Sequence, residues 1–98
     1  MKILAIEKEV PGITEQDYIP HLKPEAMKAW ELYQQGIIRE LYFTEKDHFA
    51  VLILECEGED EAKKYLNTLP LVKEGLIEFN VMGLIPYPGF ARLFSNKS

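Results

Sequence analysis

The chain has 98 residues, 47% of them hydrophobic, and carries eleven basic against sixteen acidic residues for a net charge of −5. This length suits one domain, and the hydrophobic fraction is that of a globular rather than a disordered chain. The negative balance argues against nucleic acid or an anionic membrane as the main partner. Because no apolar run approaches the roughly 18 residues of a membrane helix, we expect no membrane span.

The cysteine count and the first residues bear on the compartment. The single cysteine, Cys56, cannot close an internal disulfide, which is typical of a reducing environment. Residues 1–10 have one early lysine, a short apolar run and acidic residues from position 7 onward, without a small-residue cleavage site. This pattern is not that of a secretory signal, so we expect a cytoplasmic protein.

The N-terminal part predicts a strand followed by a broken helix. Residues 2–10 are mostly apolar and end at a Pro-Gly pair, as a strand does before a turn. Thr14, with Asp17 three residues later, resembles a helix start. Two prolines then predict an irregular first turn, with the firm helix beginning about Pro24 and stopping at Gly36.

The rest of the chain predicts a hairpin, a short helix and a last strand. Residues 37–44 and 48–56 are rich in β-branched and aromatic residues and are separated by a short polar stretch. A helix is expected from Asp60 to Thr68, where Pro70 stops its continuation. The last strand is expected at about residues 76–85.

The element order is therefore β-α-β-β-α-β, which predicts an α+β, ferredoxin-like domain over residues 1–85. Its four-stranded antiparallel sheet would carry two helices on one face. Because residues 50–55 are apolar on both faces, the second face also needs a cover. A second copy of the same sheet would supply it, giving a two-fold homodimer. Residues 86–98 would form a stiff, aromatic-rich tail that packs on a neighbouring subunit.

Four short motifs in the C-terminal half resemble the muconolactone isomerase family of the dimeric α+β barrel superfamily. Their order and spacing carry the resemblance, which covers about half of the chain. The N-terminal half departs from the family's longer, more charged first helix. The matching motifs are G-x-x-R-x-L at Gly36, Arg39 and Leu41, H-F-A at His48–Ala50, L-P-L at Leu69–Leu71, and I-E-F-x-x-x-G-L ending at Leu84.

The resemblance implies face-to-face dimers, larger rings, and a pocket between sheet and helices. In that family a small lactone undergoes a double-bond shift in the pocket without a cofactor or metal. Such a shift needs a base, an acid, and a group that holds the developing enolate. The chain has no His, Cys and Asp cluster at metal-ligand spacing.

Three residues are candidates for the proton transfer. His48 opens the third strand and could act as base or acid; alternatively it is a solvated histidine at the hairpin mouth. Glu7 and Glu78 lie in the first and last strands, which neighbour each other in this fold. A carboxyl buried there would have a raised pKa, whereas an exposed one would pair with Lys2 or Lys8.

Arg39 is the candidate for binding an anionic group of the substrate, by a two-pronged hydrogen bond to a carboxylate. The alternative is an ion pair with Glu40, with Glu55 or with a partner subunit. A hairpin loop of two or four residues would place Arg39 and His48 on one sheet face, and a loop of three would place them on opposite faces.

Four further residues are candidates for the pocket wall. His21, in the irregular start of the first helix, could form a lip of the pocket or could be an exposed loop histidine. Trp30, Tyr33 and Tyr42 could form an apolar aromatic wall, or could simply belong to the core. On the helix, Trp30 and Tyr33 are expected to share an inner face with Ala26 and Ala29.

Three functions follow from these observations. The first is a cofactor-free isomerase acting on a small lactone or carbonyl compound. The second is a cofactor-independent or heme-related monooxygenase of the same superfamily, whose sign would be a closed aromatic cavity with few charges. The third is a non-catalytic ligand-binding or assembly subunit, in which polar strand residues pair with each other and leave no open pocket.

Overall fold

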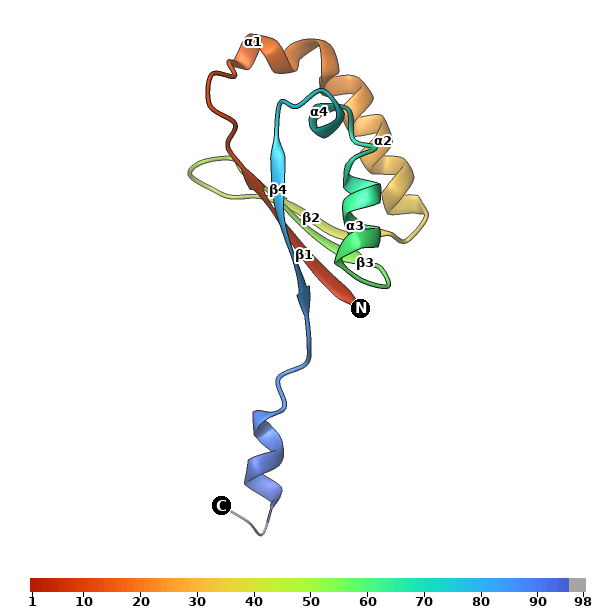
Figure 1. Cartoon of the computed structure of the whole chain (residues 1–98), viewed down its shortest axis with the longest axis vertical. Coiled ribbons are helices and arrows are strands. Elements are labelled where there is room, and N and C mark those ends of the chain that lie inside the picture. Colours follow the sequence, from red (N-terminus) through yellow and green to blue (C-terminus); the bar gives the residue numbers. More distant parts are fainter. Residues whose placement is uncertain (96–98) are drawn as a thin grey trace.

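The computed structural model describes residues 1–95, which form a four-stranded sheet, helices packed on it, and a projecting tail (Figure 1). In chain order the elements are β1 (Lys2–Lys8), α1 (Glu15–Tyr18), the 3-10 helix η1 (Ile19–His21), α2 (Leu22–Gln34), β2 (Ile38–Phe43), β3 (Ala50–Glu55), α3 (Glu59–Leu66), α4 (Pro70–Lys73), β4 (Glu78–Leu84) and the 3-10 helix η2 (Gly89–Phe94).

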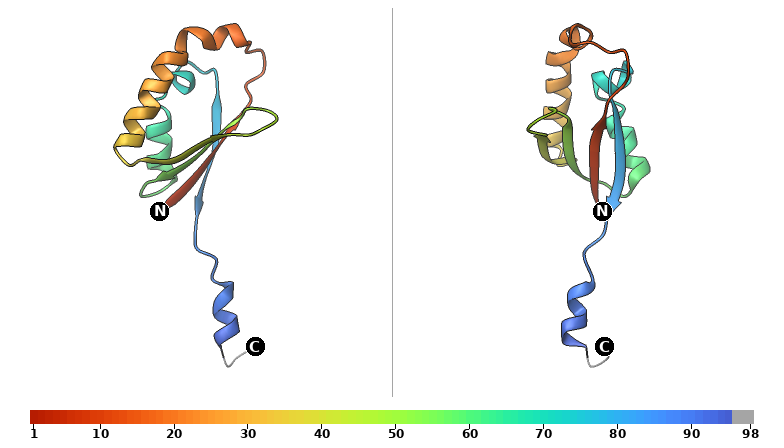
Figure 2. Two further views of the ribbon diagram at one scale, coloured as in Figure 1. Left: turned by 180° about the vertical axis from the view of Figure 1, so that it is seen from behind. Right: turned by 90° about the vertical axis from the view of Figure 1, so that its left-hand side faces the viewer.

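The sheet has the strand order β2-β3-β1-β4, and all of its pairings are antiparallel. Helices α2 and α3 lie on one side of it, as Figures 1 and 2 show. This arrangement confirms the predicted ferredoxin-like α+β fold. No helix within residues 1–95 is long and apolar enough to cross a membrane.

The core lies between the sheet and the two long helices. Strands alternate their side chains between faces, so every second residue points toward the helices. On β1 these are Ile3 and Ala5, both fully buried, and on β3 they are Leu52 and Leu54. The helices cover them with buried apolar side chains, Leu32 of α2 and Ala62 and Leu66 of α3.

The opposite face of the sheet is apolar and partly open. Its central strands expose part of Leu4, Ile6, Val51 and Ile53 on this face, and β4 adds Met82. No element of the described chain packs over these side chains in any view of Figures 1 and 2. The central strand β3 therefore carries apolar residues on both faces, as its sequence predicted.

The start of the helical region differs from the sequence-based boundary. The backbone N–H of Thr14 donates to the Asp17 carboxylate at 2.7 Å, so the predicted helix start is real, but α1 has only four residues. After η1, α2 begins at Leu22 rather than at Pro24. A proline is tolerated here because the first turn of a helix has no partner for its N–H groups.

The predicted inner face of α2 was wrong for its aromatic residues. Trp30 and Tyr33 are 54% and 51% exposed, and their rings stack on each other at 5.7 Å on the outer surface. The residue that α2 buries in the core is Leu32, while Ala29 packs beside it. Leu32 and Ala29 therefore form the core side of α2, and the large rings lie on the solvent side.

Pro70 begins a helix as well as ending one. It occupies the first position of α4, where its fixed φ and missing N–H are favourable. After α4, the backbone N–H groups of Leu76 and Ile77 both donate to the carbonyl of Leu71, and Gly75 has a φ of 74°. This turn delays β4 to Glu78, two residues later than predicted.

The tail extends away from the domain beyond β4 (Figures 1 and 2). The radius of gyration of 16.5 Å exceeds the roughly 13 Å of a compact chain of this length. Tyr87 packs edge-on against Phe90, at 5.1 Å, and covers Gly89, where a Cβ would overlap the tyrosine ring. The tail also exposes large apolar residues to solvent, namely Ile85, Tyr87, Phe90, Leu93 and Phe94. Its packing on a neighbouring subunit stays a prediction.

Candidate functional site

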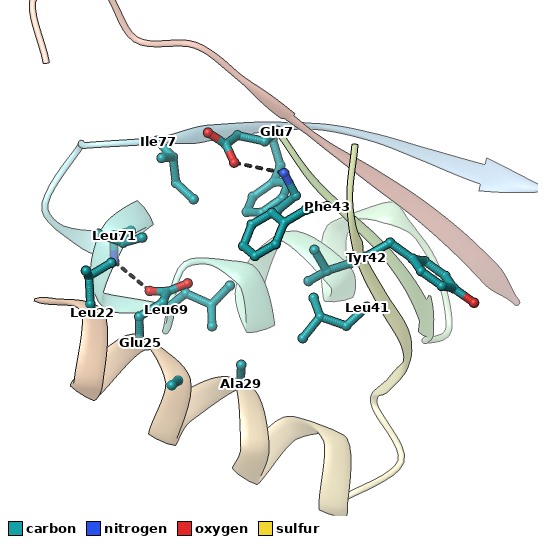
Figure 3. A pocket seen from close by; sticks show the side chains of 14 residues that line it. Glu7, Leu22, Glu25, Ala29, Leu41, Tyr42, Phe43, Leu69, Leu71 and Ile77 are labelled. Atoms are coloured by element: carbon teal, nitrogen blue, oxygen red, sulfur yellow. Dashed lines mark hydrogen bonds between the residues drawn. The ribbon is translucent and has the colours of Figure 1, made fainter. Parts of the chain in front are cut away.

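A pocket of about 470 Å³ lies between the sheet, α2 and the segment around α4 (Figure 3). It is the kind of concave, mostly apolar space in which small-molecule sites are found. Its wall is made of apolar side chains with two acidic exceptions. The lining residues are Glu7, Leu22, Glu25, Ala26, Ala29, Leu41, Tyr42, Phe43, Ala50, Leu52, Leu69, Leu71, Ile77 and Phe79.

Glu7 reaches the pocket because it continues the inward-facing row of β1 after Ile3 and Ala5. The ladder between β1 and β3 ends at the pair Ile6 and Val51. The next N–H on β3, that of Ala50, donates instead to Oε1 of Glu7 at 2.9 Å. The Glu7 side chain thus replaces a backbone acceptor at the end of the ladder and is held at the pocket wall.

Glu25 comes from the first turn of α2 and faces the pocket from the other side. Its Oε1 accepts a hydrogen bond of 2.8 Å from the backbone N–H of Leu71. Burial raises the pKa of the Glu25 carboxyl, and the negative charge of Glu7 raises it further. The Leu71 N–H and His21 act in the opposite direction without reversing the shift. Glu25 therefore holds a proton at a higher pH than an exposed glutamate.

The two carboxyl groups have a free oxygen each. Within residues 1–95, Oε1 of Glu7 and Oε1 of Glu25 each accept one backbone hydrogen bond. The two Oε2 atoms accept none from the protein. Figure 3 shows both groups at the pocket with apolar side chains between them. No lysine or arginine lines the pocket in the described part of the chain. Its electrostatics are therefore set by two carboxyl groups in an apolar wall.

Two of the residues singled out in the sequence line this pocket, Glu7 and Tyr42. The hydroxyl of Tyr42 turns away from the cavity (Figure 3) and donates to Oε1 of Glu40 at 2.7 Å. This hydrogen bond to Glu40 raises the pKa of the phenol. Tyr42 therefore contributes part of its ring and backbone to the rim, while its polar atom faces solvent.

Three further candidates lie away from the pocket lining. His48 is exposed in the hairpin loop, with a positive φ of 55°, and its ring lies 6.3 Å from that of Phe43. Glu78 faces the other side of the sheet and pairs with Lys8 at 3.4 Å. Arg39 occupies the bulge between β2 and β3, where its Nε donates to the carbonyl of Gly36. Their proposed roles in the chemistry stay predictions.

The hairpin loop and the first helical region carry the remaining candidate residues. The backbone N–H of Thr44 donates to the carbonyl of Phe49 at 2.8 Å, so the hairpin loop has four residues. This is one of the two lengths that would place Arg39 and His48 on one face. The bulge at Arg39 and the loop position of His48 remove both from a regular sheet face. His21 is half-buried, and its charge lowers the pKa of Glu25. Trp30 and Tyr33 lie outside the pocket lining.

Glu25 is the site residue that sequence reasoning missed. The signal was present, because residues 22, 26 and 29 fall on one helical face and all line the pocket. Glu25 interrupts that face with a single acidic residue directly after Pro24. Its partner, the Leu71 N–H, depends on α4, which the sequence did not predict. In the described chain no three His, Cys, Asp or Glu residues lie close enough together to hold a metal ion.

Comparison with protein-family models and with curated proteins gave no match. Among solved structures, the chain is similar to 5-chloro-2-hydroxyhydroquinone dehydrochlorinase (TftG) from Burkholderia phenoliruptrix AC1100, in its complex with 2,5-dihydroxybenzoquinone. The TM-score is 0.68 with 22% identity, over 91% of this chain and 98% of that one. This similarity shows a shared fold, and membership of the dimeric α+β barrel superfamily stays a prediction. The narrower likeness to muconolactone isomerase stays a prediction.

Proposed function

We propose that the protein is a small-molecule enzyme that moves a proton on a small cyclic carbonyl compound, such as a lactone, without a cofactor. The observation that carries this proposal is the pairing of two carboxyl groups in an otherwise apolar pocket. Glu25 has a raised pKa and Glu7 lies across from it. Two carboxyl groups with different environments are a recurring basis for acid and base roles in one site.

In the proposed reaction, Glu7 acts as the base. Its free Oε2 takes a proton from the carbon that lies between the carbonyl and a double bond. The electron pair of that C–H bond then spreads into a dienolate. The Ala50 N–H, which donates to the other oxygen of Glu7, holds the carboxylate in a fixed orientation during the transfer.

Glu25 acts as the acid. In its protonated form, which the raised pKa favours, Glu25 gives its proton to the far end of the dienolate, so the double bond moves into conjugation with the carbonyl. One proton leaves the substrate and one is returned, and the enzyme resets when the proton passes from Glu7 to Glu25 through solvent. No oxidant, metal or cofactor enters this balance.

The pocket walls favour this chemistry over the two alternatives. A monooxygenase was expected to have a closed aromatic cavity lined by Trp30, Tyr33 and Tyr42, but the first two lie on the outer surface. A non-catalytic subunit was expected to pair its polar strand residues and leave no pocket, whereas Glu7 faces an open one. The solved enzyme of similar fold is named for a cyclic oxygenated compound, which also supports a small cyclic substrate.

For the assembly we propose a two-fold homodimer through the open sheet face. The apolar row along β1 and β3 would pack on its symmetry mate, and the charged residues near its ends carry both signs. In a two-fold interface the same surface of both subunits meets. A border that carries both signs of charge can therefore form ion pairs with its own copy. The tail, with its exposed aromatic residues, would pack on another subunit.

The test is an ultraviolet assay of conjugation with purified protein. The substrates are α-angelica lactone, a neutral lactone whose double bond would move into conjugation, and muconolactone, a charged lactone whose double bond is already conjugated and would move the opposite way. Turnover of either that Glu7→Gln loses, while Glu74→Gln on the exposed turn keeps it, supports the proposal. A folded protein that converts neither compound contradicts the isomerase function.

A further inference from the structure

The charge of the pocket limits the substrate class, a consequence that rests on the proposed function of this site. Within the described part of the chain, Glu7 and Glu25 are the only lining residues with charged side chains, and both are acids. An anionic ligand would bring a further negative group into an apolar space beside Glu7 and, in its ionised form, Glu25. Like charges that face each other there repel strongly, because little water screens them.

The basic groups around the pocket do not offset its negative charge. Lys28, on α2, pairs with Glu31 at 3.2 Å and does not line the pocket. Arg39 lies in β2, and its Nε donates to the carbonyl of Gly36 in the turn before that strand. The charge of His21 lowers the pKa of Glu25, but the His21 side chain is outside the lining.

The free oxygens of the two carboxyl groups specify what a ligand should offer. Each Oε2 accepts no hydrogen bond from a donor within residues 1–95, so a ligand hydroxyl can donate to it when the carboxyl group is ionised. Such a bond to a carboxylate is short and stronger than one between neutral groups. Phe43 and Phe79, with Leu41, Leu52 and Leu69, offer apolar surface to a ring placed between the acids.

We infer that the site accepts ring compounds that carry hydroxyl groups and rejects those that carry a carboxylate. Glu7 and Glu25 are its specificity-determining residues. This assigns a hydroxylated carbocycle or lactone without an anionic group as the substrate class, and excludes muconolactone, which is an anion at neutral pH.

The test is calorimetric titration at pH 7 with three compounds of matched shape. These are 4-hydroxybenzyl alcohol, which is neutral, 4-hydroxybenzoate, which is an anion, and 4-hydroxybenzylamine, which is a cation. We expect the alcohol to bind at least about tenfold more tightly than the benzoate, as one unscreened like-charge contact predicts. The double variant E7Q/E25Q should bring the two affinities within about threefold, and Glu74→Gln should leave their ratio unchanged.

Four results would overturn the inference. These are benzoate binding as tightly as the alcohol, an affinity ratio unchanged in the double variant, amine binding no more tightly than the benzoate, or no binding of any of the three. The proposed function fails separately, when ligands bind in the expected order but α-angelica lactone is not converted. The order of affinities and the turnover therefore report on different claims.

Discussion

The backbone N–H of Leu71 and the carboxylate of Glu25 are joined by a hydrogen bond of 2.8 Å that links α4 to the first turn of α2. This contact closes one side of the pocket, since Leu69 and Leu71 also line it. It also fixes the acid whose pKa is raised by burial. One contact thus serves both the shape of the pocket and the position of its acidic group.

The first prediction concerns stability and pH at Glu25. Because the fold raises the pKa of Glu25 above its value in the unfolded chain, ionisation lowers the free energy of unfolding as pH rises through that pKa. Glu25→Gln keeps an acceptor for the Leu71 N–H but cannot ionise. Its stability relative to the parent protein should therefore be higher at pH 7 than at pH 4, as measured by urea unfolding.

The opposite pH trend would show that ionised Glu25 stabilises the fold. It would contradict the raised pKa of Glu25. Glu25→Ala serves as the comparison because it removes the acceptor as well as the charge. It leaves the N–H of Leu71 without its protein partner, which should cost about 1–3 kcal/mol when that group stays partly buried.

A second prediction distinguishes the two faces of α2. Leu32→Ala should lower the free energy of unfolding by about 2–5 kcal/mol, because it leaves a cavity in the core. Trp30→Ala removes a larger side chain, but one that is half-exposed, and should cost less than about 1.5 kcal/mol. Denaturant titration of both variants measures the difference. Equal losses would mean that the outer aromatic pair supports the fold as much as the core does.

A third prediction tests the sheet-to-sheet dimer. Ile53→Lys places a charge in the middle of the open apolar face, next to Leu4 in the β1–β3 register. The variant should be monomeric where the parent protein is dimeric, because an unpaired charge cannot be buried in the interface. Light scattering after size exclusion gives the mass, and Thr68→Lys, on the helix side, is the matched control. A parent protein that is monomeric at micromolar concentration contradicts the dimer.

A fourth prediction concerns the tail. Removing residues 86–98 should leave the urea midpoint of the domain nearly unchanged, since the tail projects away from it. It should abolish any species larger than the dimer and leave the dimer intact. If the truncated chain unfolds at much lower urea concentration, the tail packs on its own domain in solution. If the larger species persist, the tail is not the contact that forms them.

The fold could be predicted because the patterns that define it are local. Short apolar runs in residues 2–8 and 50–55, the prolines and the short polar connections predict the strands and their order. The face of α2 was harder to assign, because Trp30 and Leu32 are both large and apolar and differ by little more than half a turn. Only the packing of Ala29 close to the sheet shows which of them is buried.

The site could be predicted only in part, because its acids are brought together by contacts distant in sequence. Glu7 could be named from its place in the first strand. Glu25 is held by the N–H of Leu71, 46 residues away, in a four-residue helix too short to show periodicity. His48 and Arg39 were selected by residue type and motif, and neither property determines the direction of a side chain in a loop or bulge.

The most direct test of the account is solvent exchange at the carbon next to the carbonyl of α-angelica lactone, followed by NMR in D₂O. The parent protein should incorporate deuterium there and form the conjugated isomer. Glu7→Gln should slow the exchange by about 10²–10⁴-fold without unfolding, as loss of a general base does. Exchange at the parent rate in the folded E7Q/E25Q variant would show that these carboxyl groups do not move the proton.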